Sequence, residues 1–122
     1  MVKIEAIIRP QRIERVRAAL GDIGCAQITV TDVRGSGTEE RCTHWYRGSA
    51  YTMDLLPKMK IEIIALEADV TCIIQAIVAA AQTGASGDGI VFISPVLEAV
   101  RIRTGEWGEP AVSENPLSRF PF

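Results

Sequence analysis

In residues 58–81, KMKIEIIALEADVTCIIQAIVAAA, two different hydrophobic periods follow one another, and they are the strongest indication of the fold. From Lys58 to Ala65 the apolar residues alternate with Lys60 and Glu62, which is the period of a strand with one buried face. From Val70 to Ala81 the apolar residues recur three and four positions apart, which is typical of an amphipathic helix. The stretch therefore predicts a strand that is followed closely by a helix.

The N-terminal third of the chain carries the same two patterns. Alternating isoleucines predict a strand over Val2–Arg9, which Pro10 ends. Apolar residues at helical spacing then predict a helix over Ile13–Ile23, which Gly24 closes. A second strand is expected over Gln27–Arg34, where apolar and polar residues alternate again.

A fourth strand is predicted within Gly89–Pro95, and an extended segment is expected over Leu97–Arg103. The order is therefore β-α-β-β-α-β with a C-terminal extension. This order predicts an α+β, ferredoxin-like sandwich in which both helices cover one face of an antiparallel sheet. The other face includes Ile7, Val33 and Ile64, so we expect it to be buried between subunits of a homo-oligomer.

Length and composition restrict the class of protein. The 122 residues fit one domain, and a net charge of -2 argues against a protein that binds nucleic acid by neutralising phosphates. The three cysteines, Cys25, Cys42 and Cys72, form no CxxC pair, which predicts neither a disulfide framework nor a zinc site. The absence of a signal-type stretch and of a long apolar run predicts a cytoplasmic protein that is not embedded in a membrane.

The segment between Arg34 and Lys58 is an unusually long loop with little periodicity. It carries Trp45, Tyr46 and Tyr51, which are unusual in a simple linker. Aromatic and charged residues on a loop that leaves a rigid sheet indicate recognition of a partner.

Residues 83–89, TGASGDG, lie between the second helix and the fourth strand. Closely spaced glycines let backbone N–H groups approach an anion. An ordinary tight turn is the alternative, because the segment follows a helix and is neither a P-loop nor a dinucleotide fingerprint.

Arg101 and Arg103 lie on the same side of the predicted extended segment, a spacing that suits contacts to phosphate. Two solvated arginines on an edge strand are the alternative. Gly35 and Gly37 begin the long loop. Taken together, the three elements predict a phosphate-binding cleft that none of them establishes alone.

No catalytic set is visible in the sequence. His44 is the only histidine, and a Cys42–His44 pair on a long loop would not be pre-organised for catalysis. We therefore expect neither an enzyme nor a metal site of the protein's own. A ferredoxin-like RNA-binding module is the rival from another class, but the candidate strands lack the aromatic residues on which bases would stack.

At several stretches the sequence resembles the PII nitrogen-regulatory signal-transduction family. Tyr46–Tyr51 is similar to the YRGAEY-type signature of the family's T-loop, residues 83–96 to its B-loop signature, and residues 99–106 to its C-loop. Residues 4–10 and 56–63 match as well.

This resemblance implies a homotrimeric PII-like domain over residues 1–112, with a C-terminal extension over residues 113–122. The T-loop is expected at about residues 36–56, the B-loop at about 83–90 and the C-loop at about 101–108. ATP and ADP would compete for sites at the subunit clefts. The T-loop would dock onto an ammonium channel or a metabolic enzyme, and no nucleic-acid partner is implied.

The nucleotide-binding positions that the resemblance implies are Thr29, Gly35, Gly37, Thr38, Glu39, Ile64, Gly87, Asp88, Gly89, Ile90, Arg101, Ile102 and Arg103. Glu39 could ligate a Mg²⁺ ion that accompanies ATP. Tyr51 matches a tyrosine that some family members modify, although a plain aromatic contact residue at the loop tip is the alternative.

Three departures from the family change these expectations. Ile90 stands where the family has a Lys or Arg, and the lost cationic contact would weaken phosphate binding by about 1–2 kcal/mol. Glu39 and Glu40 replace a glutamine and a lysine, so the effector 2-oxoglutarate is expected to bind weakly or not at all although Lys58 is kept. A different small metabolite or anion is the alternative effector. The tail over residues 113–122 exceeds the usual family ending and is expected to be loose.

Overall fold

A computed structural model describes the backbone of residues 1–36, 42–46, 49–53 and 55–113, and the side chains of residues 1–36 and 55–113. Its main elements are β1 (Val2–Ile8), α1 (Ile13–Asp22), β2 (Thr29–Gly35), β5 (Leu56–Ala65), α2 (Val70–Ala81) and β6 (Gly89–Pro95). One turn of 3₁₀ helix precedes each long helix, at Pro10–Arg12 and at Glu67–Asp69. None of the helices in the described part of the chain has the length and hydrophobicity that a membrane span requires.

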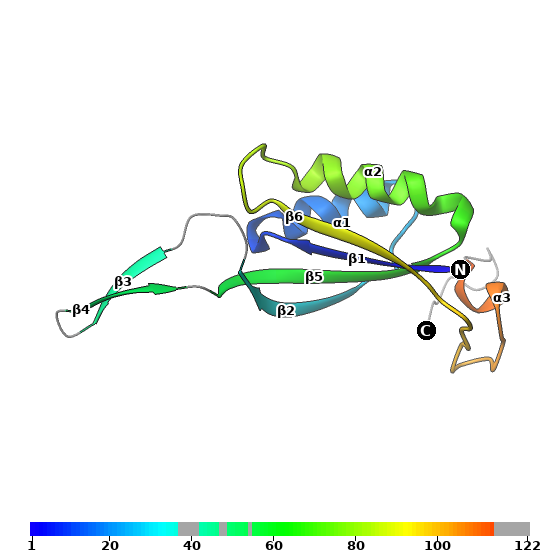
Figure 1. Ribbon diagram of the computed structural model, residues 1–122. Coiled ribbons are helices and arrows are strands. Elements are labelled where there is room, and N and C mark those ends of the chain that lie inside the picture. The colour runs from blue at the N-terminus through cyan, green and yellow to red at the C-terminus, as the bar shows by residue number, and fades with distance from the viewer. Residues whose placement is uncertain (37–41, 47–48, 54, 114–122) are drawn as a thin grey trace.

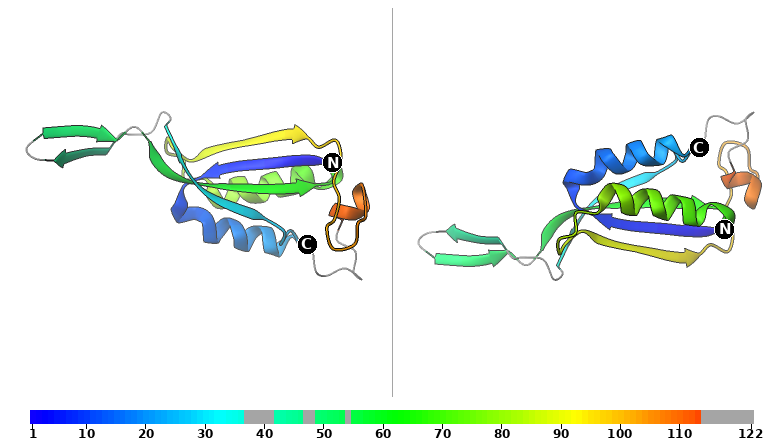
Figure 2. Two further views of the ribbon diagram at one scale, coloured as in Figure 1. Left: turned by 90° about the horizontal axis from the view of Figure 1, so that it is seen from below. Right: turned by 90° about the horizontal axis from the view of Figure 1, so that it is seen from above.

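The four long strands form one antiparallel sheet in the order β2-β5-β1-β6. Both helices lie side by side on one face of this sheet, and the opposite face is open (Figures 1 and 2). The predicted ferredoxin-like arrangement is therefore confirmed. The central strands are β1 and β5, and β6 begins where β1 ends, because Ile8 pairs with Gly89.

The core lies between the sheet and the two helices. Most residues of the apolar patterns are buried: Ile4, Ala6 and Ile8 of β1, Ile61, Ile63 and Ala65 of β5, Val16 and Leu20 of α1, and Ile73, Ile77 and Ala81 of α2. Ile23 and Val78, which belong to the same helical patterns, are instead 40% and 44% exposed. Branched side chains in alternation suit a strand that packs on one face only. The core therefore fixes the register of the strands, because a slip of one strand by one residue would turn all of its buried side chains to the open face.

The open face of the sheet is partly charged and partly apolar. Lys3 contacts Glu5 and Glu62 at 2.8 and 3.0 Å in ion pairs across its centre. Apolar side chains lie beside these pairs, and Phe92 of β6, which pairs with Glu5, is 51% exposed. An apolar residue this large and exposed on a sheet face is typical of a surface that another chain covers.

The long segment between β2 and β5 contains a hairpin that the sequence analysis did not predict. Strands β3 (Cys42–Tyr46) and β4 (Ser49–Met53) pair in antiparallel fashion, with Cys42 opposite Met53. Figure 1 shows this hairpin extending away from the four-stranded sheet, beyond the start of β5. The two strands form a sheet of their own, and the sequence between Arg34 and Lys58 has little of the periodicity by which the other strands were predicted.

The segment after β6 corrects a second expectation. It is not extended as far as Arg103: the chain turns over residues 102–104, and Gly105, with φ of 71°, donates its N–H to the Arg101 carbonyl at 2.7 Å. Val100 then pairs with Trp107. A short helix, α3 (Glu109–Val112), follows, which the sequence analysis also did not predict.

Candidate functional site

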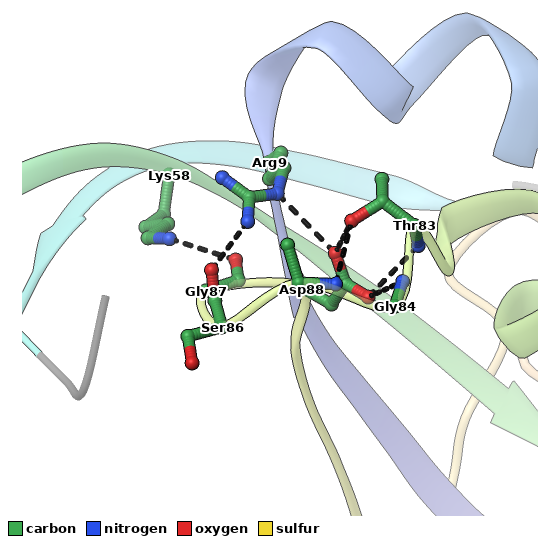
Figure 3. A network of polar contacts seen from close by, with 8 residues as sticks. Arg9, Lys58, Thr83, Gly84, Ser86, Gly87 and Asp88 are labelled. Atoms are coloured by element: carbon green, nitrogen blue, oxygen red, sulfur yellow. Dashed lines mark hydrogen bonds and ion pairs between the residues drawn. The ribbon is translucent and has the colours of Figure 1, made fainter. Parts of the chain in front are cut away.

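The B-loop joins α2 to β6 at one end of the sheet, and Asp88 holds its shape. The Asp88 carboxylate accepts hydrogen bonds from the N–H groups of Thr83 and Gly84, at 2.8 and 2.9 Å, and from the Thr83 hydroxyl (Figure 3). The Thr83 hydroxyl oxygen in turn accepts the Ala85 N–H at 3.2 Å. The first turn of the loop is therefore closed by a carboxylate, much as a carboxylate caps the N–H groups at the start of a helix.

Two cations from the sheet contact the same loop. Arg9, directly after β1, donates its Nε to the Asp88 carboxylate at 3.3 Å and its Nη2 to the Ser86 carbonyl. Lys58 of β5 donates its Nζ to the Gly87 carbonyl at 3.1 Å. Figure 3 shows these contacts converging on three consecutive residues of the loop from β1 and β5.

The surroundings of Asp88 favour its charged form. The hydrogen bond from the Thr83 hydroxyl, with those from the Thr83 and Gly84 N–H groups, holds the pKa of Asp88 well below its usual range, and Arg9 acts in the same direction. Partial burial opposes this shift but is the smaller effect. The charged Asp88 side chain therefore holds the shape of the loop, and Arg9 balances its negative charge.

The glycines of the loop have conformations that other residues seldom adopt. Gly87 has φ of 96° and Gly89 has φ of 116°. A Cβ built on Gly89 would lie 2.9 Å from the Ile7 carbonyl carbon and closer still to its oxygen. The sheet itself therefore requires glycine at Gly89, because β6 passes so close to β1 there.

The sequence-predicted residues at this end of the molecule are Gly35, Lys58 and Gly87 to Ile90. A Cβ on Gly35 would lie 3.8 Å from the Lys58 side chain. The start of the long loop therefore lies beside the lysine of β5 that contacts the B-loop. Ile90 pairs with Ile7 and is 52% exposed. The predicted positions Gly37, Thr38, Glu39 and Tyr51 lie outside the residues whose side chains are described.

Thr29 and Ile64 lie toward the other end of the sheet. Thr29 begins β2 opposite Glu62, and Ile64 is near the end of β5, six residues or about 20 Å along the strand from Lys58. A pocket of about 340 Å³ adjoins Ile64 and is also lined by Cys25, Gln27 and Cys72. Within one chain, these two residues are therefore separated from the B-loop glycines.

Arg101, Ile102 and Arg103 also lie at this other end, past the end of β6 (Figure 1). Arg101 is 2% exposed and donates to the Ala111 carbonyl through Nε and Nη2, at 3.3 and 3.1 Å, and to the Ser113 carbonyl at 3.4 Å. Arg103 is exposed, and Ile102 is 97% exposed. The turn over residues 102–104 means that the two arginines do not form the parallel pair that the sequence predicts for an extended segment.

Arg9 is the residue of this site that the sequence analysis missed. Nothing in its local sequence distinguishes it from the other arginines between Arg9 and Arg17. The signal is topological: once β1 and β6 are paired, the residue after the end of β1 has to lie beside the loop that precedes β6. Among the described residues, no three His, Cys, Asp or Glu side chains gather where they could hold a metal ion.

Comparisons with known proteins agree with this architecture. The family model for nitrogen regulatory protein P-II matches residues 1–106. "Nitrogen regulatory protein P-II 2" of Methanothermobacter thermautotrophicus is 54% identical over 112 residues, which cover 92% of this chain and 97% of that protein. "Nitrogen regulatory protein P-II" of Cereibacter sphaeroides is 49% identical over 112 residues, 92% of this chain and 100% of the relative.

A solved structure agrees as well. The crystal structure of Arabidopsis thaliana PII bound to citrate superposes with a TM-score of 0.75 at 38% identity, and the match covers 93% of this chain and 91% of that one. The relatives are named as regulatory proteins and not as enzymes, as the sequence predicts for this chain. With its sheet, its helices and nearly all of its length matched in this way, the chain belongs to the family of nitrogen regulatory proteins P-II.

Proposed function

We propose that this protein is a PII-type regulator that binds ATP or ADP in clefts between the subunits of a homotrimer. The observation that carries the proposal is the separation of the candidate residues. The B-loop lies at one end of the sheet, whereas Thr29, Ile64 and the C-loop arginines lie at the other (Figure 1). A single chain offers only half of a nucleotide site at each end, so a second copy would complete each site.

The B-loop fits a phosphate group in its backbone chemistry. Gly87 and Gly89 adopt positive φ values, and neither carries a side chain that would keep an anion from the backbone. Arg103, which is exposed in the C-loop, would supply a cationic contact from a neighbouring copy. Arg101 would contribute only if its buried guanidinium left the Ala111 and Ser113 carbonyls. Because Ile90 supplies no cation, ATP, which has more charge to neutralise than ADP, would lose more affinity.

Control of a target is proposed to run through the T-loop. The β3–β4 hairpin reaches beyond the sheet, where it can contact another protein without disturbing the core (Figure 2). An ammonium channel or an enzyme of nitrogen metabolism is the proposed target, since the relatives are named as nitrogen regulators. The hairpin carries Tyr51, which is a candidate modification site.

A weakened response to 2-oxoglutarate forms part of the proposal. Lys58 is only 8% exposed to solvent, and its ammonium group donates to the Gly87 carbonyl at 3.1 Å. The ammonium group has three N–H donors, so it can keep this hydrogen bond and still face an anion, but a dianionic effector would also meet the carboxylates of Glu39 and Glu40. A sensor of another small anion is the second candidate, and the Arabidopsis relative was solved with citrate bound.

Isothermal titration of the nucleotide-free protein tests both candidates. The protein is titrated with ATP and with ADP, each with and without Mg²⁺, and then with 2-oxoglutarate or citrate in the presence of Mg-ATP. We expect ADP to bind at least as tightly as ATP and 2-oxoglutarate to add no heat. Micromolar 2-oxoglutarate binding would contradict the weakened response, and binding of neither nucleotide would contradict the proposed function.

A further inference from the structure

We propose that Arg9 is a positioning residue for phosphate binding, which acts by orienting the peptide groups of the B-loop and does not contact the nucleotide itself. The proposal rests on the proposed function in one respect, namely that the anion is the phosphate of an adenine nucleotide. Three observations carry it: the direction of two carbonyl groups, the use of the other N–H groups in the loop, and the geometry of the arginine.

The direction of the carbonyl groups follows from the contacts of Arg9 and Lys58. The Ser86 carbonyl points toward Arg9, and the Gly87 carbonyl points toward Lys58 (Figure 3). Neither peptide bond is cis, so each N–H group points opposite to the carbonyl of the same peptide group. The N–H groups of Gly87 and Asp88 are therefore directed away from the two cations, toward the other side of the loop.

Three other N–H groups of the loop are already used. Those of Thr83 and Gly84 donate to the Asp88 carboxylate, and that of Ala85 donates to the Thr83 hydroxyl. Among the residues that the structure describes, no hydrogen bond engages the N–H group of Gly87 or of Asp88. Two adjacent outward N–H groups form a donor pair of the kind that binds an anion through the backbone.

The chemistry of arginine explains why this residue suits the position. Its guanidinium contacts the Ser86 carbonyl and the Asp88 carboxylate together, and so fixes the loop on both sides of Gly87. A lysine ammonium is a point charge without this planar fork. A cation at the carbonyl oxygen also polarises the peptide group, which makes the opposite N–H group a stronger donor.

The test compares the binding of ADP with that of adenosine, which has the same base and sugar but no phosphate. In Arg9→Met we expect ADP affinity to fall about tenfold, the weight of one charged hydrogen-bonded contact, while adenosine affinity changes less than about twofold. Arg9→Lys should recover part of the loss. Arg17→Met is the matched control, because Arg17 is an exposed arginine that pairs with Glu14 on the same helix at 3.2 Å.

Two results would overturn the proposal. One is wild-type ADP affinity in Arg9→Met, and the other is an equal loss of ADP and adenosine binding, which would indicate general damage to the fold. Thermal unfolding of each variant shows whether it folds. If Arg9→Met does not fold, the same comparison of ADP with adenosine is made with Arg9→Lys.

A second readout separates this proposal from the proposed function. Inorganic pyrophosphate is titrated into isotope-labelled protein, and the amide signals of Gly87 and Asp88 are followed by NMR. We expect them to shift in the wild type, and Arg9→Met to need about tenfold more pyrophosphate for the same shift. If ADP does not bind the wild type but pyrophosphate gives this pattern, the proposed function fails and the role of Arg9 stands. If pyrophosphate moves neither signal in the wild type, the role of Arg9 fails as well.

Discussion

At the scale of single residues, Gly89 has a role that the sequence alone does not reveal. The glycines of residues 83–89 point to an anion-binding loop, but Gly89 is also a residue at which β6 lies too close to the β1 backbone for a side chain. Its φ of 116° and the nearby Ile7 carbonyl both exclude a side chain. Glycine at this position therefore serves the sheet as well as the loop.

Gly89→Ala should destabilise the protein by about 2–4 kcal/mol, because the added Cβ overlaps backbone that cannot move without breaking the β1–β6 pairing. Gly21→Ala is the matched control: Gly21 lies in α1 and has no atom within 4 Å of the position of a Cβ. That change should stabilise the protein by about 0.5–1 kcal/mol. Urea unfolding measures both, and equal stabilities for the two variants would contradict the close approach.

Asp88 gives the protein a specific response to acid. The pKa of Asp88 is lower in the folded chain than the ordinary value of about 3.9 for an aspartate. Asp88 therefore contributes fully to stability at a pH above about 3.9, and this contribution is lost as the pH falls toward the folded-state pKa. Asp88→Asn should therefore be less stable than the wild type at pH 7. Between pH 6 and pH 3 the difference in thermal unfolding midpoint should shrink. A constant difference across this range would show that the charge of Asp88 has no part in holding the loop.

At the scale of the elements, the C-terminal part of the domain depends on one buried side chain. Helix α3 has four residues, too few to be stable alone. Arg101 holds it by donating to the carbonyls of Ala111 and Ser113, at the end of the helix. Cations near the last carbonyl groups of a helix are favourable, and here the guanidinium is buried as well.

Arg101→Ala should lower the free energy of unfolding by about 1–3 kcal/mol, the cost of leaving buried carbonyl groups without their charged donor. Hydrogen exchange at the amides of Ala111 and Ser113, which donate to Gly108 and Glu109, should become faster. Ile102→Ala is the control because Ile102 is adjacent and 97% exposed. Unchanged exchange in Arg101→Ala would show that α3 is held by other contacts.

At the scale of the whole molecule, the open face of the sheet indicates self-association. Phe92 is 51% exposed on this face, next to the ion pairs of Lys3, Glu5 and Glu62. The proposed nucleotide site needs a second copy for a separate reason, since its two halves lie at opposite ends of one chain. Both features are explained if the sheets of three chains face one another.

Light scattering should give three times the 13.3 kDa mass of one chain. Phe92→Ser should shift the assembly toward smaller species, because it removes apolar area from the face that is proposed to be covered. Val78→Ser is the matched control: Val78 is 44% exposed, but it lies on α2, on the opposite layer. A monomeric wild type, or equal dissociation of the two variants, would contradict burial of the open face.

The sequence alone was enough to predict the order of the four long strands and the two long helices and most of their bounds. The period of the apolar residues is a local property, so β1, α1, α2 and the core residues Ile4, Ile61 and Ile77 could be recognised without knowledge of any partner. The β3–β4 hairpin was missed because its segment of the sequence has little periodicity, and α3 was missed because four residues are too few to show a helical period. The glycine-rich loop was recognised because backbone freedom is also a property of the local sequence.

Which residues meet depends on the tertiary structure. Arg9 and Asp88 are 79 positions apart, and they touch because β1 and β6 are neighbours in the sheet. Gly87 precedes β6 and Arg101 follows it, so the two residues lie toward opposite ends of the sheet within one chain, although the sequence alone grouped them in one cleft. Contacts of this kind follow from the pairing of segments that are distant in the sequence. That pairing is selected by burial of the whole core, and no local sequence pattern predicts it.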